Sequence, residues 1–400
     1  MKRILYSGSV HDQDEKDAVM AVLDGGVSSF ALGENVAGME RSVAALFGKS
    51  SGVMVNSGSS ALYLAVELLN LPPGSEVITS TCTFSTDISS LVRAGLVPVF
   101  VDIEADTFNA DVSRIEELVT PKTRAILLPN LIGNAPDWDA VRAIADRHEL
   151  LVVEDSCDAL GATLRGTPTG TRSDISLTSF ANSHIITCAG NGGMVLLDDD
   201  NLRDRGLLLR RWGRRSEVQL YGTRTGERDF WEEVDGIRYD NMFIFDELGW
   251  NFEPSEMGAA FGLQQLKKLP RNYERRQRNY ALYNEFFAKH VDRIVLPRQT
   301  AELETAWLCY PIIVRPDAGF TRSDIQLFLE QREVDTRTVW TGNAVRQPMM
   351  KNVTFRAPSG GMPHADLVMT GGMILPMSHA LDDDAVGYVC EQLADFLASH

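Results

Sequence analysis

Cysteine is scarce in this 400-residue chain, and basic residues are outnumbered by acidic ones. The cysteines are odd in number, widely spaced and form no CxxC pair, so we expect neither a disulfide framework nor a structural metal site. They are Cys82, Cys157, Cys188, Cys309 and Cys390. Lys and Arg total 38 against 55 Asp and Glu, a formal net charge of −17. This balance disfavours nonspecific binding to nucleic acid or to an anionic membrane, because both reward basic residues.

Long hydrophobic runs are also missing. No apolar run approaches the roughly 20 residues that span a bilayer, and the apolar part of residues 1–7 is too short for a signal peptide. We therefore expect a cytoplasmic protein without a membrane span. A chain of 400 residues is long enough for about two or three domains.

Short apolar runs alternate with helical patterns through the first two-thirds of the chain. Apolar runs at 53–55, 76–79, 97–102, 123–129 and 150–155 predict strands, and the patterns at 61–69, 112–118 and 138–148 predict helices. Buried strands that alternate with helices are typical of an α/β fold, in which helices cover both faces of a parallel sheet.

The pattern changes after about residue 200. An Arg-rich helix is predicted over 202–215, followed at 216–248 by a mixed polar and aromatic loop without regular structure, which at that length is expected to be functional. A helix at 254–266 is expected to end at Leu269 and Pro270, and a second helix follows at 275–290. A strand at 308–314 and a helix at 323–331 predict a small α+β domain.

Polar and aromatic residues follow the predicted strands, where ligands bind in open α/β sheets. Residues 56–60 (Asn-Ser-Gly-Ser-Ser) open a helix and could bind an anion or simply cap the helix. Asp155 could pair with a protonated ring nitrogen or cap the next segment. Phe84 could stack on a flat ring or belong to the core.

His184 lies between a strand-like segment at 175–180 and a Gly-rich turn at 189–193. Among these neighbours an imidazole is a candidate for proton transfer. By itself it would be read as a surface or structural histidine.

Together these segments resemble the DegT/DnrJ/StrS family of sugar aminotransferases, which depend on pyridoxal phosphate (PLP). The resemblance covers nearly the whole chain, including 31–36 and the Asp155 segment, and is most specific at 248–266. It implies a fold-type I architecture, a mostly parallel seven-stranded sheet between helices with a smaller C-terminal α+β domain. Residues 1–255 would form the large cofactor-binding domain, including an N-terminal helix and a substrate loop at 216–248, and 256–400 the smaller one.

The resemblance also implies roles for individual residues. His184 stands where the family has the lysine that links covalently to the cofactor, and an imidazole cannot make that link. The other implied roles are Gly58, Ser59 and Ser179 at the cofactor phosphate, Phe84 stacked on the ring, Asp155 at the ring nitrogen, Asp158 near the ring hydroxyl, and Asn251 at the phosphate of a neighbouring subunit in a homodimer.

A histidine at this position resembles the 3-dehydratase branch of the family, and segments 130–134, 154–158, 265–270 and 340–343 are similar to the GDP-4-keto-6-deoxy-D-mannose 3-dehydratase branch. The resemblance implies that pyridoxamine phosphate (PMP) serves to remove the C3 hydroxyl of a nucleotide-linked 4-keto-6-deoxyhexose, with L-glutamate regenerating PMP. His184 and Asp155 would be the catalytic residues.

Arginines and departures from the family pattern complete the candidate site. Arg214, Arg215 and Arg337 are candidates for the nucleotide phosphates or the glutamate carboxylate, or are surface charges. The turn after His184 is one residue longer than usual, and Asp158 replaces a more usual Gln or Glu.

Three alternatives stay open. The chain could be an aminotransferase whose lysine lies elsewhere, with Lys267 and Lys268 as weak candidates. It could be an aminotransferase-like protein with altered or lost activity, although Asp155 is kept. It could be an iron–sulfur-dependent CDP-sugar 3-dehydrase, but no cysteine occurs between Cys188 and Cys309 to hold a cluster.

Overall fold

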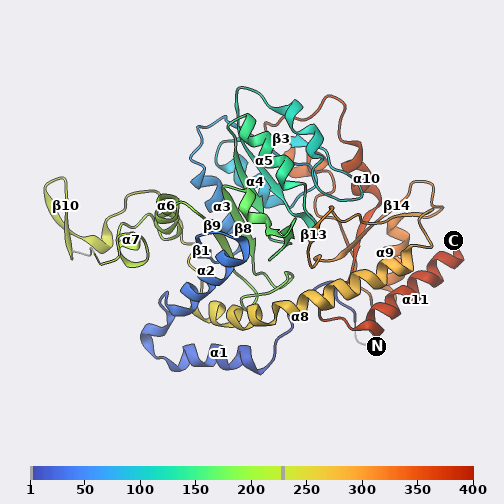
Figure 1. The fold of residues 1–400 in the computed structure, drawn as a ribbon, viewed down its shortest axis with the longest axis horizontal. Coiled ribbons are helices and arrows are strands. Elements are labelled where there is room, and N and C mark those ends of the chain that lie inside the picture. The colour runs from blue at the N-terminus through green and yellow to red at the C-terminus, as the bar shows by residue number, and fades with distance from the viewer. Residues whose placement is uncertain (1–2, 227–229) are drawn as a thin grey trace.

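The centre of the molecule is a seven-stranded sheet, seen in a computed structural model that describes residues 3–226 and 230–400 (Figure 1). The strand order is β1-β9-β8-β5-β4-β2-β3. Strand β9 runs antiparallel to both of its neighbours, and the other neighbouring pairs are parallel. The strands are β1 (Ser51–Val55), β2 (Glu76–Ser80), β3 (Val97–Val101), β4 (Thr123–Pro129), β5 (Leu151–Asp155), β8 (Ile175–Ser179) and β9 (Gly193–Leu197). The predicted mostly parallel sheet is confirmed.

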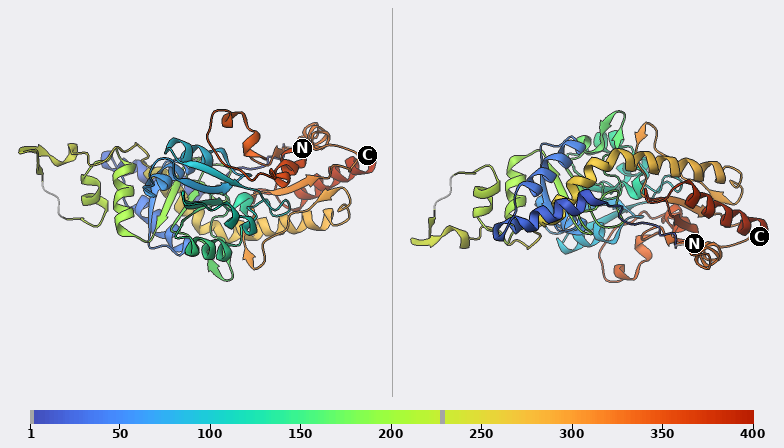
Figure 2. Two further views of the ribbon diagram at one scale, coloured as in Figure 1. Left: turned by 90° about the horizontal axis from the view of Figure 1, so that it is seen from above. Right: turned by 90° about the horizontal axis from the view of Figure 1, so that it is seen from below.

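Alternate residues of each strand enter cores on opposite faces of the sheet. In β1, Val53 and Val55 belong to one buried cluster and Met54 to another, as the two-residue period of a strand requires. The first face is covered by α3 (Gly58–Leu68), α4 (Ser85–Arg93) and α6 (Asp200–Arg210). The second is covered by α2 (Glu34–Phe47), α5 (Trp138–Arg147) and α8 (Glu256–Phe287). Figure 2 shows these two layers from above and below.

Helix α8 continues through Pro270 for 32 residues, so the predicted stop at Leu269 and Pro270 is wrong. Proline costs a helix interior roughly 3 kcal/mol, since it removes a hydrogen bond. Tertiary packing outweighs this cost: Leu269 and Asn272 are buried, and the Tyr273 hydroxyl donates to the backbone oxygen of Leu160 at 2.7 Å.

A second, four-stranded antiparallel sheet follows in the C-terminal part, in the order β12-β14-β16-β15. Its strands are β12 (Ile294–Val295), β14 (Tyr310–Val314), β15 (Arg337–Thr338) and β16 (Gly372–Leu375), and its helices are α9 (Arg322–Glu330), α10 (Pro363–Gly371) and α11 (Asp383–Ser399). The predicted small α+β part is confirmed. Ile4 is buried in its core and pairs with Val334, so the start of the chain crosses into this part.

The described part of residues 216–248 contains regular secondary structure, which corrects the prediction of a loop without regular structure. Helix α7 (Ser216–Tyr221) is followed by an antiparallel hairpin of β10 (Trp231–Val234) and β11 (Ile237–Asp240). This arm, residues 216–226 and 230–248, extends away from the body in Figure 1. The preceding helix, α6, ends at Arg210 rather than at the predicted 215, because Trp212 and Gly213 adopt positive φ angles of 59° and 76°.

The remaining elements are short or peripheral. They include α1 (Gln13–Asp24), which packs on α8, and a three-stranded sheet of β13 (Leu303–Glu304), β6 (Thr163–Leu164) and β7 (Thr167–Pro168). The predicted helix at 112–118 is instead two short 3₁₀ helices, Val112–Arg114 and Glu116–Leu118.

Candidate active site

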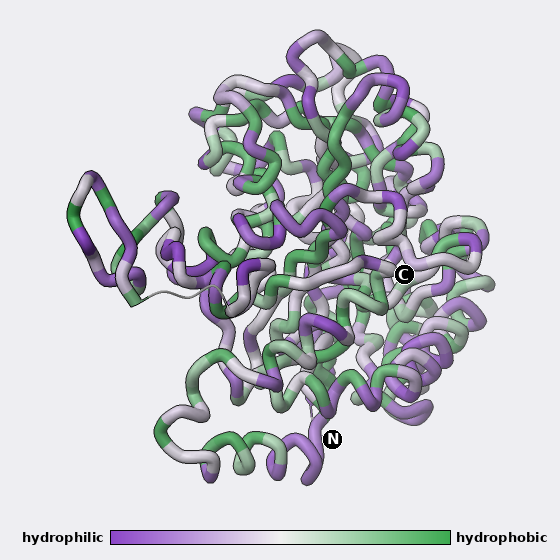
Figure 3. Tube along the Cα trace, turned by 60° about the vertical axis from the view of Figure 1, so that its left-hand side comes forward, coloured by the Kyte–Doolittle hydropathy of each residue, from purple (hydrophilic) through white to green (hydrophobic). Residues whose placement is uncertain are grey.

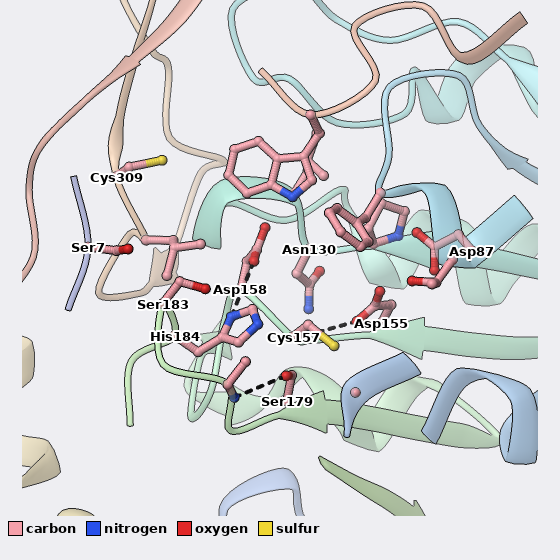
Figure 4. Close-up of a pocket in the computed structure, with 18 of the residues that line it drawn as sticks. Ser7, Asp87, Asn130, Asp155, Cys157, Asp158, Ser179, Ser183, His184 and Cys309 are labelled. Carbon is pink, nitrogen blue, oxygen red and sulfur yellow. Dashed lines mark hydrogen bonds and ion pairs between the residues drawn. The ribbon is translucent and has the colours of Figure 1, made fainter. Parts of the chain in front are cut away.

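A cavity of about 500 Å³ lies where the loops after five strands of the central sheet meet. These loops follow β1, β2, β4, β5 and β8, and residues of the C-terminal part close the other side. Figure 4 shows the side chains that point into the cavity. It unites most of the predicted site residues: Gly58, Ser59, Phe84, Asp155, Asp158, Ser179, His184 and Arg337.

One end of the cavity is suited to an anion. Helix α3 begins at Gly58, and the first turn of a helix offers backbone N–H groups and a positive dipole end. A Cβ atom on Gly58 would lie 2.6 Å from the Cβ atom of Ser179, so only glycine lets these two segments approach so closely. Ser59 and Ser179 add hydroxyl groups beside this turn.

Asp155 stands at the carboxyl end of β5 and is buried. Its Oδ1 accepts a hydrogen bond of 2.8 Å from the backbone N–H of Cys157. Burial raises the pKa of Asp155, because desolvation disfavours the charged form. A cationic group placed next to Asp155 in the cavity would favour its ionised form.

His184 and Asp158 form a close polar pair (Figure 4). His184 Nδ1 lies 3.6 Å from Asp158 Oδ1, and this buried nitrogen has no hydrogen-bond partner within the described ranges. Burial, and then the charge of Arg276, lower the pKa of His184 to about 4. Burial raises the pKa of Asp158 to about 7, although its Oδ2 accepts a hydrogen bond of 2.9 Å from the backbone N–H of Ile132. Near neutral pH the imidazole is therefore an unprotonated base with a nitrogen that lacks a partner.

Phe84 precedes α4 and is 51% exposed, and Arg337 is half exposed, with its guanidinium 5.0 Å from the Tyr6 ring centre. Both border the cavity. The half-exposed Phe84 can adapt to a ligand, whereas Arg337 is held in place: its guanidinium donates a hydrogen bond of 2.7 Å to the backbone oxygen of Thr336 and lies 3.8 Å from Asp335.

Three of the predicted residues lie away from this cavity. Arg214 stacks over Trp212, 4.7 Å from the ring centre, and Arg215 pairs with Glu232 and Asp246. Asn251 is exposed and pairs with Arg211 through a β-bridge. Because Asn251 does not line the cavity of its own chain, its predicted role at the cofactor phosphate would require the cavity of a second subunit.

Several lining residues were not predicted as site residues. Asn130 directly follows β4, just as Asp155 ends β5, a signal that the strand pattern already contained. Its side-chain amide donates to Glu154 at 2.8 Å and to Ser156 at 2.6 Å. Tyr6, Asp87 and Trp340 also line the cavity, but they come from segments that only the tertiary fold brings together.

Among the residues with described structure, no group of three or more His, Cys, Asp or Glu side chains could hold a metal ion. No helix in the described parts is long and apolar enough to cross a membrane.

The sheet, the flanking helices and the cavity define the fold-type I architecture of PLP-dependent aminotransferases. The model of the DegT/DnrJ/EryC1/StrS aminotransferase family matches residues 10–394, and the chain belongs to this family.

Two relatives illustrate the similarity in sequence. The dTDP-4-dehydro-2,6-dideoxy-D-glucose 3-dehydratase of Saccharopolyspora spinosa is 36% identical, with 98% of this chain and 86% of that protein covered. The GDP-4-keto-6-deoxy-D-mannose 3-dehydratase of Yersinia pseudotuberculosis is 30% identical, with 96% of both chains covered.

Solved structures agree with the sequence relatives. The E coli GDP-4-keto-6-deoxy-D-mannose-3-dehydratase with bound hydrated PLP superposes with a TM-score of 0.88 at 28% identity, covering 98% of this chain and 100% of that chain. A GDP-4-keto-6-deoxymannose-3-dehydratase with a trapped PLP-glutamate geminal diamine also gives a TM-score of 0.88 at 28% identity, with 97% and 99% covered.

Proposed function

We propose that this protein is a PMP-dependent 3-dehydratase that removes the C3 hydroxyl of a nucleotide-linked 4-keto-6-deoxyhexose, with L-glutamate regenerating PMP. The observation that carries the proposal is His184, an unprotonated imidazole inside the cavity at the position where the family resemblance implies a lysine. Relatives named as sugar-nucleotide 3-dehydratases, and a related structure that contains a PLP-glutamate adduct, support the substrate class and the amino donor.

The residues present fit a pyridoxal-type cofactor. The turn at Gly58, with Ser59 and Ser179, would hold the phosphate through the backbone N–H groups at the start of α3 and the two hydroxyls. Glycine at position 58 lets this turn approach Ser179 closely. Asp155 would hold the protonated ring nitrogen, Phe84 would stack on the ring and Asp158 would lie near the ring hydroxyl. When bound, this cofactor supplies an amino group that reacts with the sugar ketone and a ring that accepts an electron pair.

The protein's own part in the reaction is proton transfer in a partly closed cavity. Nδ1 of His184 is directed toward Asp158, so Nε2 remains to accept and return a proton. The raised pKa of Asp158, about 7, allows its carboxyl group to exchange a proton with solvent or with His184 near neutral pH. A histidine also leaves the aldehyde form of the cofactor unlinked to the protein, because an imidazole cannot make the covalent bond that a lysine amine makes.

We further propose that the active form is a homodimer. The arm carries apolar side chains whose exposure to water would be unfavourable in a monomer. Figure 3 shows hydrophobic segments along the arm. Phe243 and Phe245 are 57% and 52% exposed, and Leu248 is 98% exposed. A second subunit would cover them and would bring its Asn251 and Arg214 toward this cavity.

The test uses the purified protein with PMP, L-glutamate and GDP-, CDP- or dTDP-linked 4-keto-6-deoxyhexoses in separate reactions. We expect 2-oxoglutarate, ammonia and a 3-deoxy sugar with at least one of them, and the same assay identifies the nucleotide. The His184→Asn variant should retain PMP and lose sugar deoxygenation. The matched control is His148→Asn, because His148 pairs with Glu116 on the surface. Substantial turnover by His184→Asn would exclude this assignment of the base.

A further inference from the structure

Asp87 is a second buried carboxyl group beside Asp155, and the assignments above give it no role. It lies in the first turn of α4, is 0% exposed and lines the cavity. Figure 4 shows Asp87 and Asp155 on the same side of the cavity, one from the start of α4 and the other from the end of β5.

The hydrogen bonds of Asp87 leave one oxygen without a partner. The Thr83 hydroxyl donates to Oδ2, whereas Oδ1 is buried and accepts no hydrogen bond from any group in the described ranges. An ionised carboxylate can only accept hydrogen bonds, and leaving such an oxygen unpaired in the interior is costly. A protonated Asp87 removes this cost, because its O–H can donate to the neighbouring carboxylate of Asp155.

The charges around Asp87 also favour its protonated form. The titratable groups that face it are the carboxyl groups of Asp155 and Asp158, and the Cys157 thiol lies beside Asp155. Within the described part of the chain, Asp87 forms no ion pair with a lysine or an arginine. Burial, and then the negative charge of Asp155, raise the pKa of Asp87 well above its ordinary value. Two adjacent buried carboxyl groups cannot both be ionised at low cost, so they share one proton.

We propose that Asp87 holds this proton and donates it in a hydrogen bond to Asp155, so that the pair carries one negative charge located on Asp155. Asp87 is then a positioning residue. This role rests on the proposed function: the O–H of Asp87 keeps Asp155 ionised and fixed in orientation, and Asp155 in turn keeps the cofactor ring nitrogen protonated. The alternative is an ionised Asp87 that only stabilises the N-terminus of α4.

The proton itself is tested on the protein without cofactor. Infrared difference spectra are recorded at pH 7 for wild type and Asp87→Asn, both labelled with carbon-13 at the aspartate carboxyl groups. We expect the substitution to remove a protonated-carboxyl band. The matched control is Asp139→Asn, since Asp139 also lies in the first turn of a helix but is on the surface and is paired with Arg165 and Arg172; it should remove an ionised-carboxylate band. Loss of an ionised band in Asp87→Asn would overturn the proposal.

The positioning role is tested by the absorbance of bound PMP against pH. Asp87→Asn keeps an N–H donor toward Asp155 and should titrate like wild type, whereas Asp87→Leu removes the donor. Hydrogen bonds to charged groups are strong enough that the leucine variant should lower the ring-nitrogen proton affinity by about tenfold or more. Equal titration of both variants would refute the positioning role. If the leucine variant does not fold, the infrared experiment still tests whether Asp87 holds the proton. Failure of the protein to bind PMP or to convert any sugar would refute the proposed function alone, because the infrared experiment needs neither.

Discussion

Replacing Gly58 by alanine should separate helix propensity from the geometry of the anion-binding turn. The added Cβ atom would lie 2.6 Å from the Cβ atom of Ser179, 2.8 Å from its Oγ and 3.2 Å from the Cys157 sulfur. These atoms belong to buried segments at the ends of β8 and β5, so they cannot move away freely. Overpacking of this kind costs about 1–3 kcal/mol. Alanine regains up to about 1 kcal/mol, because it is a better helix former than glycine.

The expected net result is a loss of about 0–3 kcal/mol in the free energy of unfolding, measured by urea denaturation without cofactor. A larger effect is expected on PMP affinity. Displacing the Ser179 hydroxyl weakens a hydrogen bond to a charged phosphate, which corresponds to about 10- to 150-fold weaker binding in an absorbance or fluorescence titration.

Gly206→Ala in α6 is the matched control. A Cβ atom there has its nearest neighbour, Val53 Cγ2, at 3.5 Å, an ordinary contact distance. We expect this variant to be as stable as wild type or more so, with unchanged PMP affinity. The reasoning is refuted if Gly58→Ala matches Gly206→Ala in both measurements.

Three further predictions follow from the site and the arm. His184→Gln should gain stability relative to wild type as the pH falls from 6.5 toward 4, by about 1.4 kcal/mol per pH unit in urea unfolding. Burial lowers the pKa of His184 to about 4, so the wild type loses the stability tied to neutral His184 as the pH falls. A stability difference that does not depend on pH would contradict this prediction. Phe84→Ala should weaken PMP binding by about 2- to 13-fold with little change in stability, since a ring-stacking contact contributes about 0.5–1.5 kcal/mol and the side chain is half exposed in the free protein. An unchanged titration would remove Phe84 from the cofactor site. The double change of Phe243 and Phe245 to serine should lower the molecular mass measured by light scattering from dimer toward monomer, and a stable dimer in this variant would show that the arm is not the interface.

Much of the large sheet could be predicted because its strands are buried on both sides. The apolar residues at 53–55 and at 152–153 are buried, and the polar residues at the carboxyl ends of these strands mark the edge where ligands bind. His184 and Asp155 could be placed at this edge for the same reason, and both line the cavity.

Other features depend on contacts that are distant in the sequence. The continuation of α8 through Pro270 rests on partners such as Leu160, more than a hundred residues away. The closeness of Asp87 and Asp155 arises only when β2 and β5 lie in one sheet, separated by β4. The hairpin in the arm has few core-facing residues, so its polar and aromatic composition resembles that of a loop.

Helix α8 couples the thermal unfolding of the two parts of the molecule. Near its start, Glu256 accepts hydrogen bonds from the backbone N–H groups of Gly33 and Val36, at 2.6 Å and 2.9 Å. Toward its end, Asn279 donates to the backbone oxygen of Ser378 at 3.1 Å, and the Tyr283 hydroxyl donates to that of Pro376 at 2.8 Å. Because one continuous helix is part of both cores, neither core can melt without breaking the contacts of the other, and calorimetry should record a single heat-absorption peak.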